Sequence, residues 1–333
     1  KISFLTSVWP SVSGATTGGL KRVMDIAKMN EKQPNAKQVV RDLMKAAVPE
    51  RSSELDELWD KYSPEVEVAK DAKGITMNAN KHRIQFDNKT MKVLWLMGFN
   101  GWQTLGLYSP AVFLSGVLGV SIDGILMEDE DRGQLEFDHK CRSSMAEDML
   151  DGMNVAEAQW PSDIPRPVSD REELSSIQDK ATYDLVCMAV TFVFLHEFRH
   201  VMFIKDKSMP PERLEEEIGC DVWARSFMTE KIGEYAQASG KKHQEIQQKR
   251  AMAIALGAVI IHSITPATER WGTADYPPIA DRLHSMVSGI GPSNESNYWI
   301  FAACLLISIL RREGRELPMI AADPRELVSD LIE

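Results

Sequence analysis

The sequence contains few cysteines, no excess of positive charge and no long apolar run. Four cysteines are scattered over 333 residues without a Cys-x-x-Cys pair, which excludes a disulfide framework and a thiolate metal cluster. Lys and Arg number 38 against 49 Asp and Glu, a net charge of -11, so no positive field is available to bind nucleic acid. We therefore expect a cytoplasmic protein without a nucleic-acid partner.

The longest apolar runs are short. Residues 253–264 and 299–310 each make up about a dozen residues, whereas a helix needs about 20 to span a bilayer. They predict buried core helices and no integral membrane association. The first residue, Lys1, is not Met, which suggests that a preceding segment was removed. Peripheral attachment to a membrane through the N-terminal region stays an alternative.

Composition divides the chain at residues 158–170, where three prolines interrupt any apolar periodicity. We interpret this stretch as a linker. Residues 1–157 mix helical and strand patterns and form a predicted α/β region with a regulatory or substrate-binding role. Residues 171–333 have an almost entirely helical pattern. The predicted fold class is therefore α+β, with a mixed N-terminal region followed by a mostly helical domain.

The N-terminal region contains both kinds of periodicity. A helix is expected over residues 36–62, short strands at 75–77 and 83–87, and an apolar stretch broken by glycines over 91–120.

Helix-start signals dominate beyond the linker. Ser169 with Glu172 has the pattern of a capping box, which predicts a long helix from there to about residue 204. Another helix is expected to begin at Pro210-Pro211. Further helices are expected over residues 241–265, 277–289 and 296–313.

The motif that could carry catalysis lies late in the long predicted helix. It is His196-Glu197-Phe198-Arg199-His200, an HExxH spacing. Histidines four residues apart lie one turn apart and about 40° apart around the helix axis, so both imidazoles can bind one metal ion. Glu197 falls about 100° from His196, beside the ion, where it can take a proton from water. Amide hydrolysis at neutral pH needs such a Lewis acid and such a base.

A catalytic zinc ion usually has three protein ligands, so a third is expected downstream. Three candidates, Glu215, Glu216 and Glu217, lie in the helix that Pro211 begins. On a helical wheel, apolar residues define the inward arc, namely Leu214, Ile218, Ala224 and Met228. Glu217 lies within this arc, whereas Glu215 and Glu216 are expected to point to the side and away. We therefore predict one zinc ion per chain, held by His196, His200 and Glu217.

Asp221 lies one turn beyond Glu217 on the same face. A zinc-binding histidine usually donates its other ring N–H to a carboxylate, and we pair Asp221 with His196. The combined pattern, His196-Glu197-x-x-His200 followed by Glu217-x-x-x-Asp221, resembles that of the gluzincin metallopeptidases over residues 185–230. The resemblance implies a zincin-like catalytic domain, a zinc cofactor and hydrolysis of a peptide bond in a protein substrate.

A second motif is Tyr276-Pro277-Pro278-Ile279-Ala280-Asp281-Arg282-Leu283. It is similar in spacing to an element of the HtpX-like membrane metallopeptidases, with Tyr276 in place of a His. Tyr can donate a hydrogen bond to a tetrahedral oxyanion, so Tyr276 is a candidate catalytic residue and His284 a rival donor. Arg282 is expected either to brace Glu217 or to bind substrate.

Together, the HExxH helix, the Glu-rich helix ending in Cys220-Asp221 and the late Tyr-Pro-Pro motif resemble the Lit-type phage-exclusion peptidases. This resemblance rests on the C-terminal half of the chain. It implies a bacterial cytoplasmic protease that cleaves a host protein once infection is sensed. A latent enzyme of this kind would need an activating peptide or protein, and the N-terminal half could cover its cleft until then.

Other interpretations of these residues stay open. Cys220 is expected to be small buried packing rather than a ligand. Zinc could instead hold together the helices of a non-catalytic regulatory or interaction protein, or the histidines could be ordinary helix residues of a metal-free interaction module. For the peptidase, a substrate strand is expected to pair with a sheet edge at residues 83–87 or 122–128.

Overall fold

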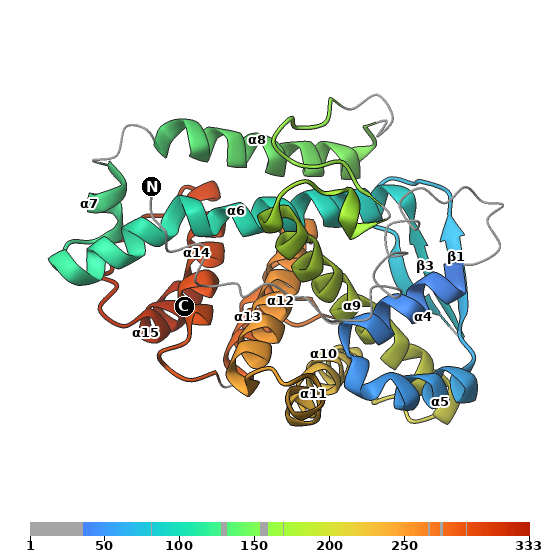
Figure 1. The fold of residues 1–333 in the computed structure, drawn as a ribbon. Coiled ribbons are helices and arrows are strands. Elements are labelled where there is room, and N and C mark those ends of the chain that lie inside the picture. The colour runs from blue at the N-terminus through green and yellow to red at the C-terminus, as the bar shows by residue number, and fades with distance from the viewer. Residues whose placement is uncertain are drawn as a thin grey trace.

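The computed structural model describes residues 36–80, 82–127, 132–153, 159–168, 170–265, 267–273, 276–290 and 292–333. They form a mostly helical protein with one small sheet at one end (Figure 1). The first elements are α4 (Ala36–Ala47), α5 (Ser52–Tyr62), β1 (Glu65–Ala69), β2 (Met77–Asn80), β3 (Arg83–Asp87), α6 (Asn88–Leu118), α7 (Ile122–Met127) and α8 (Arg132–Asp151). The later ones are α9 (Ile177–Asp206), α10 (Arg213–Thr229), α11 (Ile232–Ser239), α12 (His243–Ile264), α13 (Ile279–Ser288), α14 (Asn297–Arg312) and α15 (Pro324–Ile332). The predicted α+β class is confirmed.

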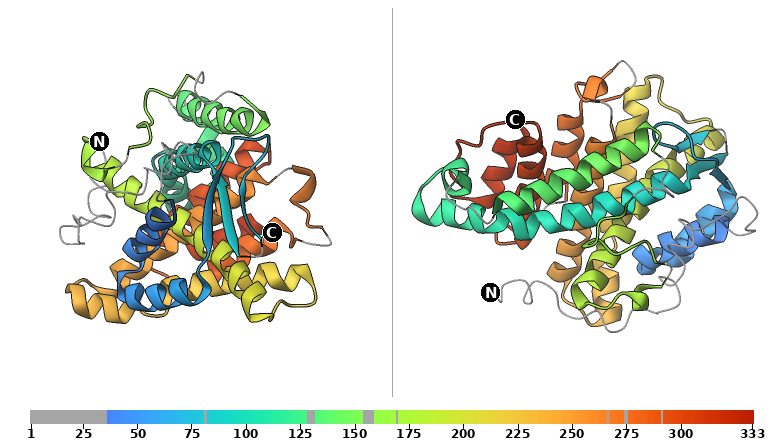
Figure 2. Two further views of the ribbon diagram at one scale, coloured as in Figure 1. Left: turned by 90° about the vertical axis from the view of Figure 1, so that its right-hand side faces the viewer. Right: turned by 90° about the horizontal axis from the view of Figure 1, so that it is seen from above.

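The three strands lie at one end of the molecule (Figure 2). Their order is β1-β3-β2, with β3 parallel to β1 and antiparallel to β2. Both sides of β3 are thus already paired, and the expectation that residues 83–87 offer a free edge is wrong. The other expected edge, at residues 122–128, is also wrong, because Ile122–Met127 forms helix α7 with Ile122, Ile125 and Leu126 buried on one face.

Local chemistry explains where the predicted helices begin. The helix expected over residues 36–62 is divided into α4 and α5, because Pro49 begins a short 3-10 helix between them and cannot donate a backbone hydrogen bond. The long helix expected from residue 170 begins only at Ile177, where the Ser176 side chain accepts a hydrogen bond from the Asp179 N–H. The capping box is formed by Asp170 and Glu173 around another 3-10 turn, and Ser169 lies outside the described residues.

Helix α6 crosses the middle of the molecule and lies alongside α8, α9 and α14 (Figures 1 and 2). Its close approach to the other helices depends on glycine. A Cβ atom at Gly98 would lie 2.6 Å from Val186 on α9, and one at Gly101 would lie 2.6 Å from Leu256 on α12. Gly98 and Gly101, two of the glycines that interrupt the apolar stretch, are therefore packing positions within one helix.

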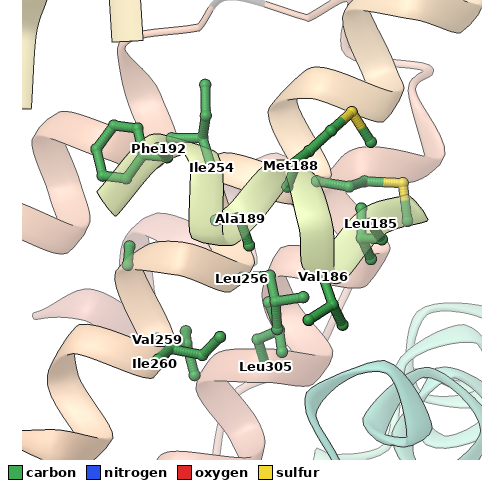
Figure 3. Close-up of a cluster of buried hydrophobic side chains, with 14 of the residues drawn as sticks. Leu185, Val186, Met188, Ala189, Phe192, Ile254, Leu256, Val259, Ile260 and Leu305 are labelled. Atoms are coloured by element: carbon green, nitrogen blue, oxygen red, sulfur yellow. The ribbon is translucent and has the colours of Figure 1, made fainter. Parts of the chain in front are cut away.

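Helix α9 is the central core helix. Its side chains Leu185, Val186, Ala189 and Phe192 lie with those of α12 and α14, among them Leu256 and Leu305, in one apolar cluster (Figure 3). Within the described residues it is the one helix long and apolar enough to cross a membrane, and 83% of that apolar stretch is buried in the protein. The apolarity of α9 is thus explained by its position in the core. The two shorter apolar runs lie in α12 and α14 and are buried, as predicted.

One buried apolar cluster contains side chains from along the chain, from Ala36 to Leu331. It includes side chains from both sides of residues 158–170, and the Trp95 indole donates a hydrogen bond to the Pro165 carbonyl within that stretch. The described N-terminal elements α4 and α6 pack directly on α9. They therefore support the helix that presents the HExxH motif.

Candidate metal centre

The two histidines of the motif lie on α9 where it packs against α10. Both rings are buried, with their centroids 4.9 Å apart. The His196 Nε2 and His200 Nε2 atoms are 3.1 Å apart. The helical spacing thus directs the same nitrogen of each imidazole toward one point, as expected from four-residue periodicity.

Helix α10 brings a carboxylate to that point. Glu217 is buried, and its Oε2 atom lies 3.2 Å from His196 Nε2 while its Oε1 atom lies 3.5 Å from His200 Nε2. In a tetrahedral zinc site with bonds of about 2.0–2.1 Å, neighbouring ligand atoms are separated by about 3.3 Å. The side chains of His196, His200 and Glu217 therefore fit a zinc ion as they stand.

Each histidine is also oriented from its other ring nitrogen. Asp221 Oδ1 lies 2.8 Å from His196 Nδ1, the contact expected from the sequence. Arg282 donates from Nε and Nη2 to the two oxygens of Asp221, over 2.7 and 2.8 Å. It therefore pairs with Asp221 rather than with Glu217. Although burial opposes ionisation, Arg282 and His196 lower the pKa of Asp221 to about 2, so this carboxylate is ionised.

A second carboxylate, which sequence reasoning missed, serves His200. Glu216 is buried, with Oε1 2.6 Å from His200 Nδ1 and Oε2 2.7 Å from Arg213 Nη1. The expectation that Glu216 points away is wrong, whereas Glu215 is exposed. The helical-wheel prediction for Glu216 is wrong because apolar residues were used to define the inward arc of the helix. The inward face of α10 is polar near the histidines, and Ile218 is 45% exposed.

The charges of this cluster do not balance by themselves. Four buried carboxylates, Glu197, Glu216, Glu217 and Asp221, face two guanidinium groups, Arg213 and Arg282. Although burial disfavours a charged imidazole, the Asp221 and Glu217 carboxylates outweigh it and raise the pKa of His196 to about 10. Without a metal ion, the proton on His196 compensates only part of the carboxylate charge, and buried negative charge is costly unless cations compensate it. One divalent cation would supply that compensation.

Glu197 is buried beside these groups, and its charge interacts with those of His196, Glu217, Arg213 and Arg282. It is 9% exposed, and burial raises its pKa to about 7, with the Glu217 charge adding to the effect and His196 opposing it. A carboxylate with a pKa near neutrality can both accept and return a proton. Its position and acidity suit a general base.

Cys220 belongs to the same cluster. Ligand atoms of His196, His200 and Cys220 lie within 4.8 Å of one another, which makes them a buried group that could hold a metal ion. The Cys220 Sγ atom lies 3.4 Å from His200 Nδ1, on the nitrogen that faces Glu216. Sequence reasoning set Cys220 aside as packing. Its spacing of four residues from Glu216 on α10 was the signal that could have placed it here.

The two candidate oxyanion donors lie in different surroundings. Tyr276 is 43% exposed, and the centre of its ring is 5.9 Å from the Arg213 guanidinium carbon. His284 is exposed on α13, two residues after Arg282 and thus about 200° around the helix. Tyr276 therefore lies at the border of the cluster, whereas His284 lies on a different face of α13 from the arginine that enters it.

Comparisons with known proteins identify a peptidase family. Neither the curated proteins nor the solved structures include a match to the chain. The family model Peptidase U49 matches residues 84–302, about two thirds of the sequence, including both histidines, the carboxylates of α10 and the Tyr-Pro-Pro motif. A member of a peptidase family is a hydrolase that acts on a protein substrate. The chain belongs to the Peptidase U49 family.

Proposed function

We propose that this peptidase is a zinc-dependent endopeptidase of the gluzincin type, with the ion held by His196, His200 and Glu217. The observation that carries the proposal is the convergence of the three side chains. The two Nε2 atoms lie 3.1 Å apart, and each of them has one Glu217 oxygen within 3.2–3.5 Å. A carboxylate behind each imidazole adds support, because such partners orient zinc-binding histidines. A zinc ion there supplies a Lewis acid for the scissile carbonyl and makes water acidic enough to react at neutral pH.

The protein groups then divide the proton transfers between them. Glu197 takes the proton from the attacking water and returns it to the leaving amine, a role favoured by its pKa of about 7. Tyr276, whose ring centre lies 5.9 Å from the Arg213 guanidinium carbon, is the proposed donor of a hydrogen bond to the oxyanion. Asp221 and Glu216 hold the two imidazoles in the tautomer that leaves each Nε2 unprotonated.

Glu217 is favoured over Cys220 as the third ligand. Use of the thiol would draw the ion toward His200 Nδ1, which is already in contact with Glu216. Burial also raises the pKa of the Cys220 thiol, and the surrounding carboxylates add to this effect. The Glu217 oxygens face both Nε2 atoms instead. Cys220 therefore contributes packing against the His200 ring.

The sheet offers a place for an extended substrate. Because β3 is enclosed, the edges of the described sheet are β1 and β2, and of these β2 packs on α9. Phe86, which pairs with Met77 of β2, contacts Phe194 on α9 at a ring distance of 5.4 Å, two residues before His196. A peptide that adds to β2 by main-chain hydrogen bonds would extend the sheet that packs on the HExxH helix.

The biological role proposed is that of a latent phage-exclusion protease. It rests on the Lit-type resemblance of residues in the C-terminal half, and it predicts a bacterial host protein as substrate and a peptide or protein as activator. The acidic net charge of -11 favours a basic surface on either partner.

The metal content of the intact protein tests the proposal. We expect about one zinc per chain by plasma mass spectrometry on protein purified without a metal-affinity tag. Glu217→Ala should lower it, whereas Glu215→Ala, the matched change two residues earlier, should not. A parent protein that takes up no zinc after reconstitution would contradict the proposal. If Glu217→Ala keeps its zinc and Cys220→Ala loses it, the third ligand is Cys220 and not Glu217.

The alternative of a non-catalytic, zinc-stabilised protein gives a different result. A structural zinc site contributes folding energy outright, so chelation would unfold the protein. A preformed catalytic site should lose hydrolysis while the melting temperature falls only modestly. Circular dichroism melting curves with and without a chelator distinguish the two.

A further inference from the structure

Arg213 contacts two carboxylates of the candidate metal centre at once. It lies in the first turn of α10, with Nη1 2.7 Å from Glu216 Oε2 and Nη2 2.6 Å from Glu217 Oε1. Both carboxylates are buried, whereas the Arg213 side chain is 39% exposed. The guanidinium thus lies between the buried carboxylates and solvent.

Helix stability does not explain this position. A cation in the first turn opposes the helix macrodipole, which favours negative charge there. The planar fork of a guanidinium, however, can bond two acceptors in fixed directions, which an ammonium cannot do. The placement of Arg213 is therefore explained by the two carboxylates that follow it by three and four residues.

The two contacts have different consequences. The bond to Glu216 fixes the carboxylate that lies 2.6 Å from His200 Nδ1, so it sets the orientation of that imidazole indirectly. The bond to Glu217 engages Oε1, which also lies 3.5 Å from His200 Nε2, whereas Oε2, 3.2 Å from His196 Nε2, has no bond to Arg213. Arg213 thus makes the two oxygens unequal, with Oε2 the one left to a metal ion.

We infer that Arg213 is a positioning residue that makes Glu217 a ligand through a single oxygen and so keeps a fourth coordination position open. This inference rests on the proposed function, because an open position is what distinguishes a catalytic zinc site from a structural one. Without Arg213, both oxygens of Glu217 are free to bind the same ion, and Glu216 loses the partner that holds it against His200.

The test compares Arg213→Met and Arg213→Lys with a matched control, Arg225→Met. Arg225 lies on the same helix and donates to the Ser285 carbonyl of α13, so its loss reports ordinary packing damage. Zinc affinity is measured by competition with a chromophoric chelator, and coordination by the visible absorption of the Co²⁺-substituted protein. Neither readout requires a substrate.

We expect Arg213→Met to bind zinc about 10–100-fold more weakly than the parent, the range for loss of a group that orients metal ligands. Its Co²⁺ absorption should become weaker, because the coordination number increases. Arg213→Lys should recover only part of the affinity, and Arg225→Met should match the parent in both readouts.

An Arg213→Met protein with the parent's zinc affinity and Co²⁺ spectrum would overturn the inference. If that variant does not fold, Arg213→Lys decides the same question, since a lysine variant identical to the parent in both readouts would also overturn it. A parent protein that binds neither Zn²⁺ nor Co²⁺ would instead remove the proposed function itself.

Discussion

At the scale of single residues, the two histidines of the HExxH motif have matching surroundings. Each Nδ1 faces a carboxylate and each carboxylate is held by an arginine. The two series are His196, Asp221 and Arg282, and His200, Glu216 and Arg213. A buried histidine usually has at least one hydrogen-bond partner. Here each histidine has a charged partner on Nδ1, and the two Nε2 atoms face each other, an arrangement that could hold a metal ion.

Glu197→Gln tests the base directly. The amide has the same shape but cannot take a proton, so hydrolysis should fall by at least about 100-fold while zinc content stays at the parent level. Labelling of new protein N-termini in a bacterial lysate, with parent and variant compared, detects cleavage without a known substrate. Equal cleavage by both proteins would exclude Glu197 as the base.

Asp221→Asn tests how much the ion pair between Asp221 and Arg282, next to His196, stabilises the fold. Arg282, whose side chain is 12% exposed, loses the carboxylate that neutralises it, and leaving a buried charge unpaired costs about 3–5 kcal/mol. We expect urea unfolding of the metal-free variant to show a loss in that range. Asp281→Asn, an exposed change on α13, is the control and should stay within about 0.5 kcal/mol of the parent. A loss equal to that of the control would mean that Asp221 is dispensable for folding.

At the scale of elements, periodicity predicted most of the helices. It predicted less well which face of a helix is buried. The four-residue spacing in α9 and the alignment of Glu217 with Asp221 in α10 follow from local backbone geometry, which is the same in any helix. The face of α10 that carries Glu216 could not be deduced in this way. Its burial depends on His200 and Arg213, and the apolar residues Leu214 and Ile218 near that end are not fully buried.

Two glycines of α6 should respond in opposite ways to the same substitution. A Cβ at Gly116 would clash with the Ala321 carbonyl oxygen, a backbone atom, whereas a Cβ at Gly106 meets nothing within 4 Å. Gly116→Ala is expected to cost about 1–3 kcal/mol because the chain must shift. Gly106→Ala should add up to about 1 kcal/mol through helix propensity. Thermal unfolding of the pair provides the comparison, and equal melting temperatures would contradict the packing of α6 on residue 321.

At the scale of the whole molecule, the parts that were divided by composition share a buried core. Residues from α4, α6 and β3 contribute to the same apolar cluster as α9, α12 and α14. The predicted division at residues 158–170 stays a prediction about domains. A test of latency therefore needs the intact chain, because removal of α6 would expose the apolar core around α9.

The stability of the whole fold should depend on pH through His139. Burial lowers the pKa of this imidazole to about 4, with the nearby Arg142 and Arg312 adding to the effect, whereas an unfolded His titrates near 6.5. Between these values the unfolded chain binds a proton that the folded protein does not, so the free energy of unfolding decreases as the pH falls. The contribution of His139 to this loss between about pH 7 and pH 5 should be about 2 kcal/mol.

Urea unfolding at the two pH values measures this effect. His139→Gln should lose about 2 kcal/mol less than the parent on acidification, because it removes the group that protonates only on unfolding. His243→Gln, an exposed change at the start of α12, should behave like the parent. Identical pH dependence in parent and His139→Gln would show that His139 is not the group responsible.

The sequence by itself determined the features that arise within one helix. These are the pairing of His196 with His200, the placement of Glu197 beside them, and the alignment of Glu217 with Asp221. They could be predicted because a helix repeats every 3.6 residues whatever surrounds it.

Only the tertiary structure decided which oxygens and nitrogens meet. It brought Glu216 to His200, Arg282 to Asp221 and Cys220 into the cluster, and it enclosed β3 between two other strands. These contacts join residues on different helices or strands, up to 61 positions apart. Their geometry depends on how whole elements pack, and packing is set by the sum of many buried contacts rather than by any local pattern.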